Sequence, residues 1–390
     1  MIAISLAIIS ISTLCFYNLS FSLQDIMFPV TTRFKAMLPP PSIPLQLQSS
    51  QELLVTPPPP LPSLPLPPPP SPPYEVISSL SLNKKSNSLM HNMTDQELFL
   101  AASMVQGIDD FTNNKTTPKV AFMFLIKGKL PMAPLWEKFF QGHEGLYSIY
   151  LHQDPSYKDI FREGSAFYGR KIPSQPVVWG TSSMIDAERR LLANALLDFS
   201  NQRFVLLSES CIPLFGFKTI HSYLINSSLS HLHSFYDTTK DMRGRYNPQM
   251  SPTINITNWR KGSQWFELHR DIAINIVSDT KYYPIFKKYC LPRCYSDEHY
   301  IPTLVHMMFP ESNSNRSITW VDWSIRGPHP RRYARDDITD DLMNHLRFGS
   351  TCVYNGNNTN ICFLFGRKFH PSSLEPLLRV SPPLLADYYP

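Results

Sequence analysis

The folded body of this chain opens with KVAFMFLIKG (Lys119 to Gly128), an apolar run closed by a glycine. A short run without polar alternation is typical of a strand buried on both faces of a sheet. Similar runs follow at GLYSIYLHQDP (Gly145 to Pro155), PVVWG (Pro176 to Gly180) and NQRFVLLSES (Asn201 to Ser210). We therefore predict a buried strand at each of these segments.

Helical patterns lie between these runs. A helix start is expected at Pro134 to Phe140, and residues 183–199 repeat apolar side chains at helical spacing after Thr181 or Ser182, which can cap them. Strands that alternate with helices predict an α/β fold, with one large domain, a mainly parallel sheet and helices on both faces. Ligands of such sheets bind at the carboxyl ends of the strands. The polar residues expected at that edge are Lys127, His152, Asp154, Ser208 and Glu209.

The region before the body predicts a membrane tether. Residues 1–24 carry no charged side chain, and an apolar stretch of about 20 residues can cross a bilayer as a helix. No basic residue precedes this stretch and no clear cleavage site follows it, so we expect a signal anchor rather than a cleaved signal peptide. Residues 25–117 contain dense proline runs, which form extended spacers, and are predicted to be a stem and linker. The folded domain is predicted at 118–390.

Composition and motifs exclude several classes of protein. The net charge of +5 is spread without a Lys/Arg block, which argues against nucleic acid binding. The body has no G-x-G-x-x-G, no Walker A loop and no G-x-S-x-G, so it is not predicted to be a dehydrogenase, a P-loop enzyme or a typical serine hydrolase. It also lacks an Asp-x-Asp triplet, the usual metal-holding pair of sugar-nucleotide enzymes.

Sequons and cysteines predict an oxidising compartment. N-glycosylation sequons occur at Asn92, Asn114, Asn226, Asn255, Asn315 and Asn357. Close cysteines in a secretory protein are typically disulfides, so we expect Cys290–Cys294 and Cys352–Cys362, with Cys211 free and buried. A zinc site is the alternative for one pair, and its ligands would be Cys290, Cys294, His299 and His306.

The segment CLPRCYSDEHYIPT (Cys290 to Thr303) places Asp297 and Glu298 after a tight cysteine pair and a serine that can start a helix. Such a carboxylate, held rigidly, is suited to act as a general base. Taken alone, the pair is also what a solvated helix N-terminus contains. Trp, Tyr, Arg, Asn and Gln gather at Ser234 to Met250 and Asn258 to Asp279, which suits sugar binding but equally suits core packing.

Together these segments resemble the core-2/I-branching β-1,6-N-acetylglucosaminyltransferase family (glycosyltransferase family 14), and most closely its plant branch. The resemblance covers about Lys119 to Leu378. The motifs that carry it are SESCIPL, RGRYNP, RKGSQWFEL, CYSDEHYIPT, TCVYNG and CFLFGRKF. It implies a glycosyltransferase catalytic domain at 118–390 with a GT-A-like, Rossmann-type fold. It also implies inverting, metal-independent transfer from a UDP-sugar, by family default N-acetylglucosamine, to a glycan or glycoprotein hydroxyl.

The resemblance also assigns roles to residues. Glu298 matches the family's catalytic base, and Asp297 is expected to orient its loop. Lys368 in GRKF and Arg347 ahead of Cys352 match the cations that neutralise the diphosphate, with Arg347 two residues further from its cysteine than expected. The candidates on the nucleoside side are Lys127, His152 and Asp154, where His152 stands in place of an expected Asp. Those on the acceptor side are Arg243, Arg245, Tyr246, Trp265 and Asp297.

The expected protein is thus a Golgi single-pass type II membrane enzyme with a lumenal catalytic domain, no cofactor and no divalent metal requirement. Its partners would be a UDP-sugar, a glycan or glycoprotein acceptor and, through the anchor, the membrane. Three alternatives remain open: an inactive sugar-binding module on the same fold, a glucuronosyltransferase acting on arabinogalactan-type glycans, and an extensin-type wall protein suggested by the proline tract.

Overall fold

The computed structural model describes residues 88–104, 117–239, 243–325 and 327–388. The predicted anchor at 1–24, most of the stem at 25–117 and the sequon at Asn114 lie outside these residues. Within the described part of the chain, no helix has the length and apolar character needed to cross a membrane.

The central sheet has the strand order β2-β1-β3-β5. Three of its strands are parallel: β1 (Lys119–Ile126), β2 (Tyr147–Gln153) and β3 (Asn201–Ser208). The fourth, β5 (Glu267–His269), is antiparallel to β3. The register places Leu125 between His152 and Ser208, so the carboxyl ends of the parallel strands share one edge. The predicted mainly parallel sheet is confirmed.

The strand predicted at Pro176 to Gly180 is wrong. This segment is a loop with no ladder partner in the sheet, and its Val178 and Trp179 side chains are 62% and 57% exposed. Prolines at 173 and 176 remove two backbone donors that a ladder would need. Two of its apolar residues, Val177 and Trp179, line the wall of a cavity instead.

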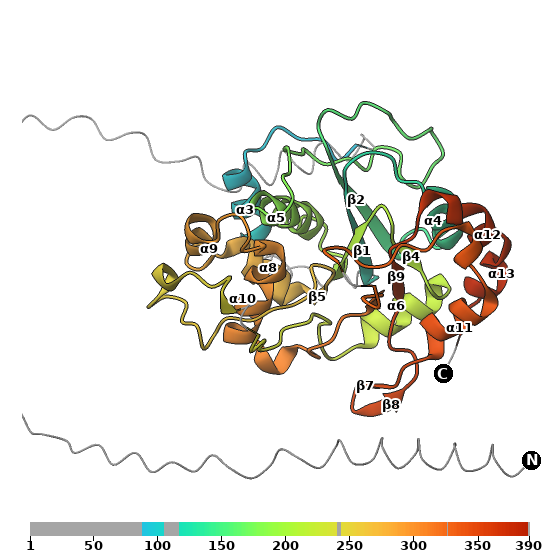
Figure 1. Cartoon of the computed structure of the whole chain (residues 1–390). Coiled ribbons are helices and arrows are strands. Elements are labelled where there is room, and N and C mark those ends of the chain that lie inside the picture. Colours follow the sequence, from blue (N-terminus) through green and yellow to red (C-terminus); the bar gives the residue numbers. More distant parts are fainter. Residues whose placement is uncertain (1–87, 105–116, 240–242, 326, 389–390) are drawn as a thin grey trace, which may run out of the picture. The chain divides into compact units, whose positions relative to one another are not determined.

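Two hydrophobic cores cover the two faces of the sheet. Helices lie on both sides of the central strands (Figure 1). Alternate residues of β1 point to opposite faces, with Met123 in one core and Phe122 in the other. The helices that contribute to the first core are α3 (Asp95–Met104), α5 (Ser183–Leu196), α8 (Arg270–Ser278), α9 (Tyr283–Tyr289) and α10 (Tyr300–Met308). Those that contribute to the second are α4 (Ala133–Phe140), α6 (Phe217–Asn226), α11 (Asp340–Phe348), α12 (Leu374–Arg379) and α13 (Ser381–Leu384).

Helix α3 (Asp95–Met104) packs against α5 and α8, so part of the segment predicted as linker belongs to the folded body. Its Asp95 accepts two hydrogen bonds from Arg190 of α5, at 2.8 and 2.6 Å. A bidentate Arg–carboxylate pair fixes orientation as well as distance. It ties the first described helix to the helix that covers the sheet.

A second sheet lies beyond the carboxyl end of β3. Its order is β4-β9-β6, formed by Ile212–Pro213, Phe365–Arg367 and Thr319–Val321. Because β4 follows β3 almost directly, this small sheet brings the GRKF segment to the edge where the parallel strands end. The strands β7 (Cys352–Tyr354) and β8 (Asn357–Thr359) form an antiparallel hairpin that precedes β9 in the sequence.

The predicted cysteine pairing is confirmed. Disulfides join Cys290 to Cys294 and Cys352 to Cys362, while Cys211 is free and buried. The zinc alternative is wrong, because its two sulfur ligands are bonded to each other. The sequon asparagines in the described residues are at least partly exposed: Asn92, Asn226, Asn255, Asn315 and Asn357.

Candidate active site

A cavity of about 1110 Å³ opens at the carboxyl edge of the parallel strands. It brings together most of the residues that the sequence singled out. Those that line it are Lys127, His152, Asp154, Ser208, Glu209, Arg245, Trp265, Asp297, Glu298 and Lys368. Its walls come from the sheet edge, from the turn before α10, and from the end of β9.

The sheet edge supplies a neutral imidazole and a held carboxylate. His152 is 1% exposed, and burial together with the charge of Arg190 lowers its pKa to about 4. Asp154 accepts hydrogen bonds from the backbone N–H and the hydroxyl of Ser156, which lower the pKa of its carboxyl. Lys127 is exposed beside them. This wall can therefore present uncharged, negative and positive groups to one ligand.

Glu298 lies at the end of the short 3-10 helix η4 (Ser296–Glu298), not in the first turn of an α-helix. Its Oε2 accepts a hydrogen bond from Nη1 of Arg245 at 2.6 Å, and its side chain is 29% exposed. Its carbonyl accepts a hydrogen bond from the N–H of Gly262 at 2.8 Å. A Cβ at Gly262 would meet the carbonyl oxygen of His233 at 2.0 Å, so only glycine allows this close approach. The carboxylate is therefore held at both its backbone and its side chain.

A buried carboxyl pair lies beside Glu298. Burial, reinforced by the negative charge of Glu298, raises the pKa of Asp297 to about 6. Burial also raises the pKa of Glu188 on α5 well above its usual range, although Nε2 of Gln264 donates a hydrogen bond to it at 2.9 Å. Oδ1 of Asp297 and Oε2 of Glu188 have no hydrogen-bond partner among the described residues. Asp297 therefore contributes polarity to the cavity rather than stability to the fold.

Asp297→Asn is expected to stabilise the protein above about pH 6. The folded-state pKa of Asp297 lies above its unfolded value, so the folded carboxyl stays protonated while the unfolded one ionises. Stability is thus lost as pH rises from about 4 to about 6, and the loss reaches about 3 kcal/mol. Urea unfolding of both proteins should show a gain of about 1–3 kcal/mol for the variant at pH 7.5 and little difference at pH 4. An equal gain at both pH values would show that the charge is not the cause.

Two adjacent cations form another part of the cavity wall. Arg367 ends β9 and its guanidinium lies 4.1 Å from the ring centroid of Trp265. Lys368 follows it, and burial, together with the charges of Arg367 and Arg332, lowers the pKa of its ammonium. The backbone around Lys368 is fixed, because its carbonyl accepts from Tyr333 N–H at 2.8 Å and the next residue donates to the carbonyl of Ser210. Both cations line the cavity, which suits a polyanionic ligand.

Three predicted site residues lie away from the cavity. Arg347 on α11 packs its guanidinium over the rings of Phe215 and Phe348 and does not line the cavity. Tyr246 is partly buried against the first core, and its hydroxyl donates to the carbonyl of Ile254. Arg243 stacks on Tyr236. The structure thus places Arg367, not Arg347, next to Lys368.

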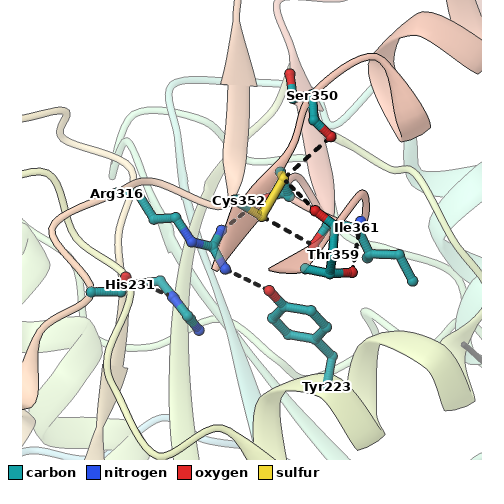
Figure 2. Close-up of a disulfide and its surroundings, with 9 residues drawn as sticks. Tyr223, His231, Arg316, Ser350, Cys352, Thr359 and Ile361 are labelled. Carbon is teal, nitrogen blue, oxygen red and sulfur yellow. Dashed lines mark hydrogen bonds between the residues drawn. A yellow bond between two sulfur atoms is a disulfide. The ribbon is translucent and has the colours of Figure 1, made fainter. Parts of the chain in front are cut away.

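The Cys352–Cys362 disulfide borders the cavity, and Arg316 is attached to it. Nη1 of Arg316 donates to the carbonyl of Cys362 at 2.8 Å, and its other terminal nitrogen donates to the hydroxyl of Tyr223. Figure 2 shows this arginine between the disulfide and the tyrosine. The bridge therefore supports the wall that carries Arg316, a cavity residue.

Several cavity residues could not be assigned from sequence. Arg367 stands inside the GRKF motif beside the lysine that was assigned, and Trp179 lies within the segment predicted as a strand. Gln264 also lines the cavity, and its partner Glu188 comes from a helix far away in sequence, so no local pattern joins them. Among the described residues, no group of three or more His, Cys, Asp or Glu side chains is placed to hold a metal ion.

A clamped carboxylate and paired cations in one cavity, at the edge of a parallel sheet, define a group-transfer enzyme of the α/β class. The family model described as Branch: Core-2/I-Branching enzyme matches residues 120–347. Glycosyltransferase BC10 of Oryza sativa subsp. japonica is 36% identical over 309 residues, which is 67% of this chain and 76% of that protein. The chain belongs to the core-2/I-branching enzyme family, in its plant branch, and is a glycosyltransferase. The expected GT-A-like fold is confirmed.

Proposed function

We propose that this glycosyltransferase transfers a sugar, by family default N-acetylglucosamine, from a UDP-sugar to a glycan or glycoprotein hydroxyl, with inversion and without a metal. The observation that carries the proposal is the placement of Glu298 and the Arg367–Lys368 pair in one cavity. A single base and a cationic site for the leaving group are the parts that an inverting transfer needs.

Glu298 is the proposed base. It takes the proton of the acceptor hydroxyl as the oxygen attacks the anomeric carbon in line. The new bond forms between this oxygen and the anomeric carbon, while the bond to the diphosphate breaks and its electron pair leaves with UDP. Arg245 holds the carboxylate at 2.6 Å, which limits its rotation before attack. Asp297 is the proposed positioning residue of the same turn.

Lys368 and Arg367 are the proposed diphosphate ligands. Negative charge grows on the leaving diphosphate, and fixed cations in a partly buried site stabilise it more than they would in water. The nucleoside would then occupy the sheet edge at Lys127, His152 and Asp154, which line the same cavity. The exposed sequons and the two disulfides support a further proposal, that the domain works in the Golgi lumen behind an N-terminal anchor.

The proposed function is tested with the purified full chain, a panel of UDP-sugars, and mixed cell-wall and glycoprotein acceptors. We expect acceptor-dependent release of UDP that is unchanged by EDTA and gives a product of inverted anomeric configuration. Loss of release in EDTA, with recovery on adding a divalent ion, would overturn metal independence. If no donor is consumed while UDP still raises the melting temperature, the chain is an inactive sugar-binding module. Preference for UDP-glucuronic acid would select the glucuronosyltransferase alternative.

A further inference from the structure

The loop at 176–180 places an exposed indole at the cavity wall. Trp179 is 57% exposed and lines the cavity, whereas its neighbour Val178 is 62% exposed and does not. An aromatic ring that is open to solvent and faces a cavity offers an apolar surface with a polar edge, which suits a ligand that is itself amphipathic. Trp179 is therefore placed to contact such a ligand from the cavity wall.

A continuous series of contacts leads from Trp179 to the proposed base. The ring of Trp179 lies 5.2 Å from the ring of Tyr295, centroid to centroid. The guanidinium of Arg245 lies 4.5 Å from the centroid of the same tyrosine ring. Arg245 in turn donates to Glu298 at 2.6 Å. The orientation of the Arg245 side chain thus depends on the ring that Trp179 contacts.

The tyrosine ring is held in place by unusual backbone on both sides. Tyr295 has a φ of 56°, the left-handed region that is costly for residues other than glycine. Gly180 has a φ of 76°, and a Cβ there would lie 3.3 Å from the Tyr295 ring. A strained residue such as Tyr295 persists at sites where a side chain must be aimed. The turn at Tyr295 and the missing side chain at Gly180 together place the ring between Trp179 and Arg245.

We propose that Trp179, supported by Tyr295, forms a sugar-binding platform for the acceptor, which therefore is a glycan of at least two pyranose rings. The proposal rests on the proposed function. A base must lie within about 3 Å of the hydroxyl that it deprotonates. The platform is separated from Glu298 by Arg245, so the ring that stacks on it belongs to the neighbouring sugar. His329, whose ring lies 5.7 Å from that of Trp179, borders the same platform.

The donor is the less suitable occupant of this platform. The charged diphosphate of the donor is assigned to Arg367 and Lys368, which line the cavity. The platform instead contacts Arg245, the residue that holds Glu298. Trp179 and Tyr295 carry no charge, and the apolar face of a neutral pyranose needs none. A sugar bound on the platform would also contact Tyr295. This contact would favour the position of Arg245 in which its guanidinium holds the Glu298 carboxylate.

The test uses the purified full chain with UDP bound and three neutral series: monosaccharide, disaccharide and tetrasaccharide of β-linked galactose, glucose and xylose. Affinity is measured by ligand-observed NMR, which needs no turnover. In at least one series we expect the tetrasaccharide to bind about tenfold more tightly than the monosaccharide, a difference typical of one well-placed tryptophan. Trp179→Ala should abolish that difference, Trp179→Phe should retain most of it, and Val178→Ala is the matched control that leaves it unchanged.

Affinity that does not grow with chain length in any series would overturn the platform. So would a Trp179→Ala variant that weakens binding of UDP-sugar and not of the glycan. A chain that binds the tetrasaccharide through Trp179 yet consumes no UDP-sugar would contradict the proposed function and leave the platform supported. Tyr295→Leu provides a second readout, because loss of the ring under Arg245 is expected to lower kcat more than it raises the acceptor KM.

Discussion

Glu298→Gln is expected to lower kcat by a factor of about 100 or more, with UDP-sugar affinity within about twofold of the wild type. Glutamine has the same shape and can still accept the hydrogen bond from Arg245, which measures 2.6 Å in the wild type, but it cannot take a proton. The loss therefore falls on the step in which the acceptor hydroxyl attacks. Single-turnover kinetics with saturating donor and acceptor measure the rate, and calorimetric titration of the UDP-sugar without acceptor measures the donor affinity.

Glu311→Gln is the matched control for this variant. Glu311 lies exposed in the turn after α10 and does not line the cavity, so the same substitution should leave kcat unchanged. A Glu298→Gln protein that keeps more than about a tenth of wild-type kcat would remove Glu298 from the role of base. Asp297 would then be the next carboxyl to test, because it lies in the same turn and its pKa is raised to about 6.

The central sheet was predictable because its strands have a simple pattern. β1 and β3 are buried on both faces, and their continuous apolar runs at residues 120–126 and 204–207 are typical of strands in that position. The error at Pro176 to Gly180 has a physical cause. A loop whose apolar side chains line a cavity and a strand that lies in a core can contain the same residue types, and a local sequence pattern does not separate them.

The candidate site was predictable where it is local in sequence. Asp297 and Glu298 are adjacent, and the cysteine pair before them indicates a fixed turn. The cation wall was less predictable. Arg347 was assigned from the resemblance, as an arginine ahead of Cys352. However, α11 turns its side chain onto Phe215, and the end of β9 carries the cation that lines the cavity. Contacts between distant segments, such as Gln264 with Glu188, leave no local signal at all.

Lys368→Gln is expected to lower kcat/KM for the donor by about 100-fold, close to the effect of removing one transition-state charge ligand elsewhere. Lys368 is half-buried at the end of β9, where its ammonium has Arg367 beside it and little water to screen it. Removing one of two adjacent cations leaves the growing diphosphate charge partly uncompensated. Because the bound diphosphate already carries charge, UDP affinity should also fall, by about tenfold.

Arg347→Gln tests whether Arg347 or Arg367 is the second cation that binds the diphosphate. Its guanidinium lies over Phe215 and Phe348, so its loss should lower the melting temperature while donor kinetics stay within about twofold of the wild type. Lys129→Gln, at an exposed lysine that does not line the cavity, controls for net charge. If Arg347→Gln reduced donor kinetics as much as Lys368→Gln, the diphosphate would have to reach α11, and the cavity wall at Arg367 would not be its site. If Mn²⁺ restored the donor kinetics of Lys368→Gln, a metal ion would be able to replace the missing cation. The proposed site of fixed cations requires no such metal.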